Sequence, residues 1–99
     1  MYLQQSVFVS RRILTPRQQY MKIICDVSDK QKVPVTEILG PLRHKYIMRA
    51  RDEAIHRIRK ELGYSTTKIG RIFGRDHSTV LTSLKRSISR EILRTNPIG

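Results

Sequence analysis

The segment that most constrains the fold of this chain covers residues 65–85, with the sequence STTKIGRIFGRDHSTVLTSLK. Apolar residues recur at helical spacing on both sides of Gly74, so the pattern predicts two short helices joined by a tight glycine turn. Gly70 falls inside the first helix, where a glycine costs up to ~1 kcal/mol relative to alanine. A glycine at that place suggests that another backbone or helix lies against it. The layout is that of a helix-turn-helix.

Small polar residues and a histidine gather at the start of the second helix. Hydroxyl groups, a carboxylate and an imidazole can each hydrogen-bond to base edges, and a threonine methyl can contact the methyl group of thymine. An arginine just before the helix suits a guanine or a phosphate. The alternative is that Asp76 only caps the helix and that the residues after it form a solvated face. The residues predicted to read bases in the major groove are Arg75, Asp76, His77, Ser78, Thr79 and Thr82.

The amino-terminal ends of the two short helices predict a second kind of contact. Free backbone N–H groups at a helix start favour anions such as phosphates. The residues predicted to contact the DNA backbone at the first of these starts are Ser65, Thr66, Thr67 and Lys68.

The charge of the chain favours a polyanionic partner. Its 99 residues hold 20 lysines and arginines and 8 aspartates and glutamates, a net charge of +12. Most of the excess lies in residues 41–99, the part that contains the predicted helix-turn-helix. Such a balance favours binding to nucleic acid and opposes the binding of cationic ligands.

Several function classes are disfavoured by the sequence. Cys25 is the only cysteine, which excludes an intrachain disulfide, and its apolar neighbours predict a buried thiol. The three histidines are scattered, and Asp52 and Glu53 are expected to be a helix-start pair, so we predict no enzyme, no metal site and no cofactor. No apolar run approaches the ~20 residues that span a bilayer, and no secretory signal is visible. We therefore expect no membrane contact and a cytoplasmic, nucleoid-associated location.

The remainder of the chain predicts a single helical domain over residues 16–95, preceded by an arm over residues 1–15. The arm shows no sustained period and is expected either to be disordered or to contact a second subunit or another protein. Thr15 and Pro16 predict a helix start, and helical spacing continues over residues 17–28. A polar loop is expected over residues 29–34.

Three further elements complete the predicted domain. A short helix over residues 37–39 is expected to have Thr36 as its cap. It is expected to be followed by a short basic loop over residues 41–45, PLRHK, called the basic loop below. A long basic helix is predicted over residues 46–62. The last helix is expected to continue to about residue 93, and its apolar stripe consists of Val80, Leu84, Ile88 and Ile92.

Together these residues resemble a known family. The segment LGYSTTKIGRIFGRDHSTVLTSLKR, preceded by RARDEAIHRIRKE, is similar to the C-terminal DNA-binding domain of bacterial replication initiators of the DnaA family. The most specific part is the run GRDHSTV at residues 74–80. The resemblance covers about residues 17–90. It implies an all-α fold, a small helical bundle with a helix-turn-helix of the Trp-repressor type.

The resemblance also implies how double-stranded DNA would be bound. Residues 76–79 would contact base edges in the major groove of a nine-base-pair site like a DnaA box. The basic loop would place a side chain in the adjacent minor groove, with Arg43 as the first candidate and His44 or Lys45 as alternatives. Phosphates would meet Arg51, Lys85 and residues 65–68.

The chain departs from the family pattern at several points. It has one glycine before Arg75 where many members have two, Ser78 where threonine is usual, and Thr67 where proline is common. These changes affect the expected target sequence more than the expected fold. No Walker motif occurs in the 99 residues, so no nucleotide binding is expected. Met1 and the dissimilar arm favour a stand-alone protein, of phage or mobile-element origin, over an excised domain.

Sequence-specific DNA binding in replication control or transcription regulation is thus the leading hypothesis. An RNA-binding protein is one alternative, although the few aromatic residues form no clustered stacking platform. A module that uses the same fold to bind another protein is the second alternative. The polar surface at residues 76–79 favours DNA binding over this second alternative.

Overall fold

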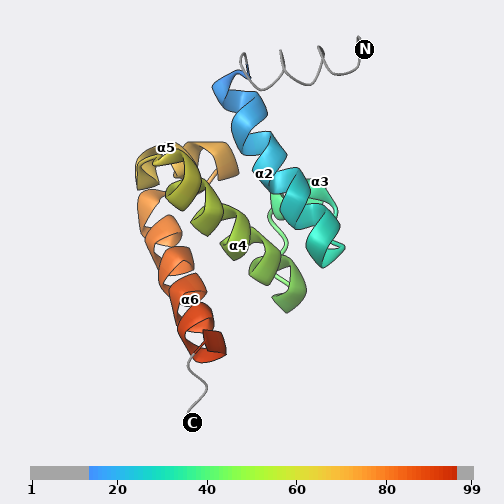
Figure 1. Ribbon diagram of the computed structural model, residues 1–99, viewed down its shortest axis with the longest axis vertical. Coiled ribbons are helices and arrows are strands. Elements are labelled where there is room, and N and C mark those ends of the chain that lie inside the picture. Colours follow the sequence, from blue (N-terminus) through green and yellow to red (C-terminus); the bar gives the residue numbers. More distant parts are fainter. Residues whose placement is uncertain (1–13, 96–99) are drawn as a thin grey trace.

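The computed structural model of the chain describes residues 14–95, which form a bundle of α-helices (Figure 1). No strand occurs within residues 14–95, and the predicted all-α fold is confirmed. Residues 1–13, most of the predicted arm, lie outside the described residues. The helices are α2 (Pro16–Gln31), α3 (Val35–Ile38), α4 (Lys45–Leu62), α5 (Thr66–Phe73) and α6 (His77–Thr95).

The long helix α4 is the centre of the bundle. It lies between α2 and α6 in Figure 1, and it contacts each of the other four helices. Its buried face carries Ile47, Ala50, Ala54, Ile55 and Ile58, none of which is more than 1% exposed. Because residues spaced by three and four share one face of a helix, this stripe packs against several neighbours at once.

Local sequence signals set most of the helix ends. Thr15 caps α2 in a reciprocal capping box, in which its Oγ1 accepts from the Gln18 N–H at 3.1 Å and its own N–H donates to Gln18 Oε1 at 2.9 Å. Ser65 Oγ caps α5 by accepting from the Lys68 N–H at 3.1 Å. Gly63 ends α4 with a φ of 69°, a left-handed conformation that favours glycine.

Two helix bounds differ from the prediction. α2 continues through residues 29–31, which were expected to be loop, and ends where Lys32 adopts a φ of 57°. α3 begins at Val35 after Pro34, so Thr36 is inside the helix and is not its cap. Pro34 has the fixed φ that suits the residue before a helix, and it offers no side-chain hydrogen bond.

One prediction of burial is wrong, and one apolar stripe is only partly buried. Cys25 is exposed, because α2 turns the face with Ile24 and Val27 toward the core and residue 25 falls on another side. The predicted stripe of α6 is only partly buried: Val80 is fully enclosed, whereas Ile88 and Ile92 are 47% and 55% exposed. The second half of α6 therefore extends past the apolar core.

A buried carboxylate joins α4 to α6. Asp52, 1% exposed, accepts from the Ser83 hydroxyl, from Arg86 Nε and Nη2 at 3.0 and 3.1 Å, and from Arg90 Nη1 at 3.0 Å. The hydrogen bond to Asp52 raises the pKa of Arg86. The expectation that Asp52 belongs to a helix-start pair is wrong, since it lies in the middle of α4. These donors compensate for the removal of the carboxylate from water.

Within residues 14–95, no helix combines the length and the apolar character that crossing a bilayer requires. Within the same residues, no three His, Cys, Asp or Glu side chains gather in a way that could hold a metal ion.

Candidate DNA-binding surface

The helix-turn-helix consists of α5, the turn at residues 74–76 and the start of α6. The Gly70 carbonyl accepts from the Arg75 N–H at 2.8 Å, and a methyl group at Gly70 would lie 2.3 Å from the Arg75 carbonyl oxygen. The turn thus crosses directly over Gly70, and the prediction that a backbone lies against this glycine is confirmed. Gly74 provides the turn itself with a φ of 66°.

Asp76 caps α6, as predicted. Its Oδ1 accepts from the Thr79 N–H and from Thr79 Oγ1, both at 3.0 Å. The bond from the Thr79 backbone, followed by the bond from its hydroxyl, holds the pKa of Asp76 below its usual range. The cap is therefore charged near neutral pH, and the capping uses only one of the two carboxylate oxygens.

The other polar residues at the start of α6 share one solvent-facing surface. His77, Ser78, Thr79 and Thr82 are all exposed, while Val80 between them is buried against the core. Thr82 Oγ1 donates to the Ser78 carbonyl at 3.1 Å, which fixes its hydroxyl against the helix. The surface offers hydrogen-bonding groups, and the imidazole of His77 is the largest side chain among these four residues. Base reading by these residues stays a prediction.

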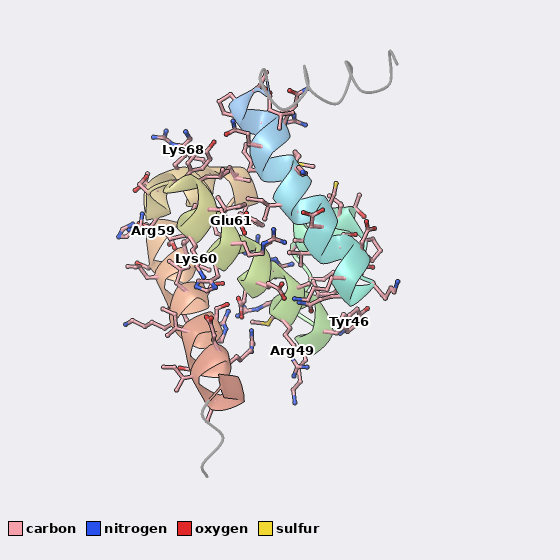
Figure 2. The ribbon with its side chains drawn as sticks, in the orientation of Figure 1. Tyr46, Arg49, Arg59, Lys60, Glu61 and Lys68 are labelled. Atoms are coloured by element: carbon pink, nitrogen blue, oxygen red, sulfur yellow. The ribbon has the colours of Figure 1, made fainter. Side chains whose placement is uncertain are left out.

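The predicted phosphate contacts at the start of α5 are accessible for the most part. Ser65, Thr67 and Lys68 are exposed and Thr66 is half-buried. The Ser65 hydroxyl is occupied by its cap, and Lys68 Nζ lies 3.8 Å from the centre of the Tyr64 ring. Figure 2 shows Lys68 on α5, far from Tyr46 and Arg49 on the first turns of α4. On α6, Lys85 is exposed as well.

The three candidates for the minor groove are exposed but differ in position. Lys45 is the first residue of α4, whereas Arg43 and His44 both precede the helix. The His44 ring stacks on the ring of Tyr46, with the centroids 5.9 Å apart. This arrangement favours Arg43, whose side chain starts from the loop, over Lys45 on the helix and over His44 in its ring stack.

The expectation that Arg51 contacts phosphate is corrected, because its side chain is buried inside the protein. Arg51 is only 5% exposed, and its guanidinium faces main-chain carbonyls of α3 and the basic loop. Nε donates to Ile38 O at 2.7 Å, and Nη2 lies 2.8 Å from Gly40 O and 2.9 Å from Leu42 O. Burial lowers the pKa of Arg51, with a further contribution from Arg75. Its side chain supports the loop from inside the protein.

Arg75 also differs from the other predicted base-reading residues. Its Nη1 donates to Phe73 O at 2.7 Å and its Nη2 to Gly40 O at 2.9 Å, so two of its nitrogens face main-chain carbonyls. Burial, and then the nearby charge of Arg43, lower the pKa of Arg75. The side chain is half-buried beside the loop, while the residues that follow it are exposed.

An open groove of about 610 Å³ lies between the basic loop and the start of α6. Arg43, Arg75 and Arg86 line it together with Thr79 and Thr82. The lining includes one carboxylate, that of Asp52, which is already paired with Arg86 and Arg90. The groove is therefore positively charged and suits an anionic strand.

Sequence reasoning missed the contribution of Arg86 to this groove. Ser83, Arg86, Ser87 and Arg90 are spaced by three and four residues on α6, which indicates a polar face. The spacing does not identify Asp52, more than thirty residues earlier, as the partner of that face.

Comparisons with known proteins point to one family. The family described as "Bacterial dnaA protein helix-turn-helix" matches residues 20–86. The chromosomal replication initiator protein DnaA of Thermomicrobium roseum is 45% identical over 51 residues, which are 50% of this chain and 11% of that protein. DnaA 2 of Protochlamydia amoebophila is 38% identical over 64 residues, 65% of this chain and 14% of that protein. DnaA 1 of Chlamydia pneumoniae is 36% identical over 72 residues, which are 73% of this chain and 15% of that protein. No solved structure matches the chain.

Proposed function

Since this chain belongs to the bacterial DnaA helix-turn-helix family, we propose that it binds double-stranded DNA at a short specific sequence that resembles a DnaA box. The curated relatives are replication initiators, and the chain spans 11–15% of their length. The proposed role is correspondingly narrow: it occupies sites in replication control or transcription regulation. The protein acts in the cytoplasm, at the nucleoid, and its matched region is a binding domain, with no catalytic step.

The observation that carries this proposal is the exposed polar start of α6 in front of a buried Val80. A helix with this division packs one face on the bundle and inserts the other into the major groove. His77 and Ser78 lie on the first turn, where side chains of a recognition helix reach base edges. Thr79 and Thr82 continue the same surface, and Asp76 supplies an acceptor for a cytosine amino group.

The basic loop and the groove beside it supply the second half of the proposed interface. Adjacent major and minor grooves of DNA are separated by one phosphodiester strand. With α6 in the major groove and Arg43 in the minor groove, that strand follows the cationic groove between them. The net charge of +12 attracts the duplex over a longer range. Residues 65–68 and Lys85 hold neighbouring phosphates.

A binding selection on randomised duplex DNA at about 150 mM salt, close to physiological strength, tests the proposal. We expect a short motif similar to a DnaA box. The double variant with His77→Ala and Thr82→Ala serves as the matched control, because both side chains are exposed and their loss leaves the core intact. It should bind DNA but enrich no motif.

The other outcomes of the selection would indicate a different function. An unrelated palindromic motif would point to a dimeric transcriptional regulator, with the second subunit or another protein contacted through residues 1–15. If the unaltered protein enriches no motif, the base-reading proposal fails, and RNA or a protein partner has to be sought instead.

A further inference from the structure

The two proposed DNA-binding elements are joined inside the protein by a pair of arginines. The basic loop follows the four-residue helix α3 and has no helical hydrogen bonds of its own to fix it. Arg51, reaching from α4, faces the carbonyls of Ile38, Gly40 and Leu42 at 2.7–2.9 Å. Hydrogen bonds from a charged donor are stronger than those between neutral groups. The loop is therefore held in one conformation from its buried side.

The helix-turn-helix reaches the same loop through Arg75. This residue directly precedes the cap of α6, and its Nη2 donates to Gly40 O at 2.9 Å. Its Nη1 donates to Phe73 O at 2.7 Å, which ties the guanidinium to its own turn. The Gly40 carbonyl thus accepts from Arg51 and Arg75 together, and a carbonyl oxygen has the two lone pairs that this requires.

We propose that Arg75 is a positioning residue, which bridges the turn to the Gly40 carbonyl and thereby sets the distance between Arg43 on the loop and His77 on α6. The inference rests on the proposed function of DNA binding. Two side chains that enter neighbouring grooves must match the fixed spacing of the duplex. A loop already held at that spacing loses less conformational entropy on binding than a free loop does. Arg75 then improves affinity without touching DNA.

The electrostatics of the cluster agree with this role. Burial is the main cause of the lowered pKa of Arg75 and of Arg51, and the charge of Arg43 adds to both, so the three guanidinium groups lie close enough to repel one another. The guanidinium groups of Arg51 and Arg75 donate hydrogen bonds to main-chain carbonyls, whereas Arg43 is exposed. A DNA strand in the adjacent groove offsets the repulsion, and Arg43 is the member of the cluster that is placed to meet it.

A double-mutant cycle separates a positioning role from direct contact. Arg75→Lys keeps the charge but loses the planar fork that reaches two carbonyls. We expect Arg75→Lys to weaken binding of the selected duplex about tenfold in the wild-type background but by less than about twofold in the Arg43→Ala background. The reason is that the position of the loop no longer affects binding once the contact of Arg43 with the minor groove has been removed. Fluorescence anisotropy of a labelled duplex gives the four dissociation constants.

Footprinting gives a readout that a general loss of structure would not reproduce. In Arg75→Lys, the minor-groove protection next to the loop should disappear, whereas protection of guanine N7 in the major groove should persist. The matched control is Arg71→Lys on α5, an exposed arginine, which should change neither protection nor affinity. If Arg75→Lys does not fold, as followed by circular dichroism, Arg75→Gln replaces it in the cycle.

The outcomes distinguish this inference from the proposed function. Equal losses in both backgrounds would show that Arg75 contacts DNA itself and would overturn the positioning role. Simultaneous loss of both protections would also overturn it, because Arg75 would then support the whole fold. If the wild-type protein binds no duplex specifically, the proposed function fails, and this inference fails with it.

Discussion

At the scale of single residues, the start of α6 shows how one side chain can serve the fold and still face solvent. Asp76 accepts two hydrogen bonds from Thr79 through one carboxylate oxygen, and the Thr82 hydroxyl is bonded to the Ser78 carbonyl. These bonds hold the polar groups in fixed places before any partner arrives. Fixed, exposed and small side chains are what a helix needs to approach base edges closely.

His77→Ala tests base reading at this surface. We expect a loss of about 1–3 kcal/mol in binding to the selected sequence and little change on random duplexes, because a base contact exists only on the correct site. The side chain is exposed, so unfolding should be unaffected. Anisotropy titrations with both duplexes at one salt concentration give the comparison. His56→Ala is the control, since that histidine lies on α4 and lines a separate cleft with Glu53 and Glu61. Equal losses on both DNAs for His77→Ala would exclude its base-reading role.

Asp76 should make the stability of α6 dependent on pH. Its pKa is lowered in the folded protein, so its contribution is complete above the unfolded value of ~3.9 and is lost as pH falls through the folded pKa. Asp76→Asn keeps a capping side chain that does not titrate. We expect the melting temperature of the wild type to fall relative to that of Asp76→Asn as pH drops below ~4. Circular dichroism melts at several pH values measure this, and parallel curves would contradict it.

At the scale of elements, α6 is held at its start by α5 and along its length by α4. The contact with α5 depends on the absence of a side chain at Gly70, where the backbone of the turn passes. The contact with α4 combines the buried Val80 with the polar cluster around Asp52. The first contact sets the direction in which α6 leaves the turn, and the second sets its rotation about its own axis.

Gly70→Ala should be more destabilising than Gly74→Ala, although alanine favours helices. The new methyl group at residue 70 would lie 2.3 Å from a carbonyl oxygen of the backbone, which cannot move without displacing the turn. We expect a loss of at least about 2 kcal/mol in unfolding free energy. A methyl group added at Gly74 would meet no other part of the protein within 4 Å, so the only cost is that of alanine in a left-handed backbone conformation, about 1 kcal/mol. Urea titrations followed by circular dichroism give both values, and the reverse order would disprove this account of the turn.

Asp52→Ala should weaken the docking of α6 on α4. Removal of one partner from a buried ion pair costs about 3–5 kcal/mol, and we expect the lower end because Arg86 and Arg90 are each 38% exposed and can reach water. The same urea titrations measure the loss. Asp26→Ala is the control: its carboxylate is half-exposed and 3.7 Å from Arg57, so it should cost about 0–1 kcal/mol. Similar losses for both variants would mean that the buried cluster contributes no more than a surface pair.

At the scale of the whole molecule, the bundle brings together basic groups from distant parts of the sequence. Arg43 comes from the loop before α4, Arg75 from the turn and Arg86 from α6, and all three line one groove. A second cleft has a more mixed lining, in which three glutamates accompany five basic side chains: Glu53, Glu61 and Glu91 with Lys30, Arg49, Arg57, Lys60 and Arg90. The groove has four arginines and Asp52 as its one carboxylate, so it is the more strongly cationic of the two.

The affinity for DNA should fall steeply with salt. If six to eight phosphates are neutralised, the logarithm of the association constant should fall against the logarithm of salt concentration with a slope of about −5 to −7. Arg43→Ala should reduce the magnitude of the slope by about 1, and Lys60→Ala, in the second cleft, should leave it unchanged. Anisotropy titrations at several salt concentrations provide the slopes. A nearly flat dependence for the wild type would contradict the proposed contact with the DNA backbone.

The sequence alone determined the features that depend on neighbouring residues. The capping box at Thr15, the caps Ser65 and Asp76, the glycine stops and the close approach at Gly70 were all predictable, because each involves residues three to six apart. The all-α class and the family followed from the same local patterns. What the residues of the candidate surface do on DNA stays a prediction.

Only the tertiary structure decided the hydrogen-bond partners of Arg51, Asp52 and Arg75. The resemblance implied that Arg51 contacts phosphate, yet the carbonyls that accept hydrogen bonds from Arg51 belong to residues 9 to 14 positions earlier. The carboxylate of Asp52 meets α6 across 31 or more residues, and Arg75 reaches Gly40 across 35. The packing of the helices decides which hydrogen-bond partner a long side chain can reach. Helical spacing along the chain does not reveal that packing.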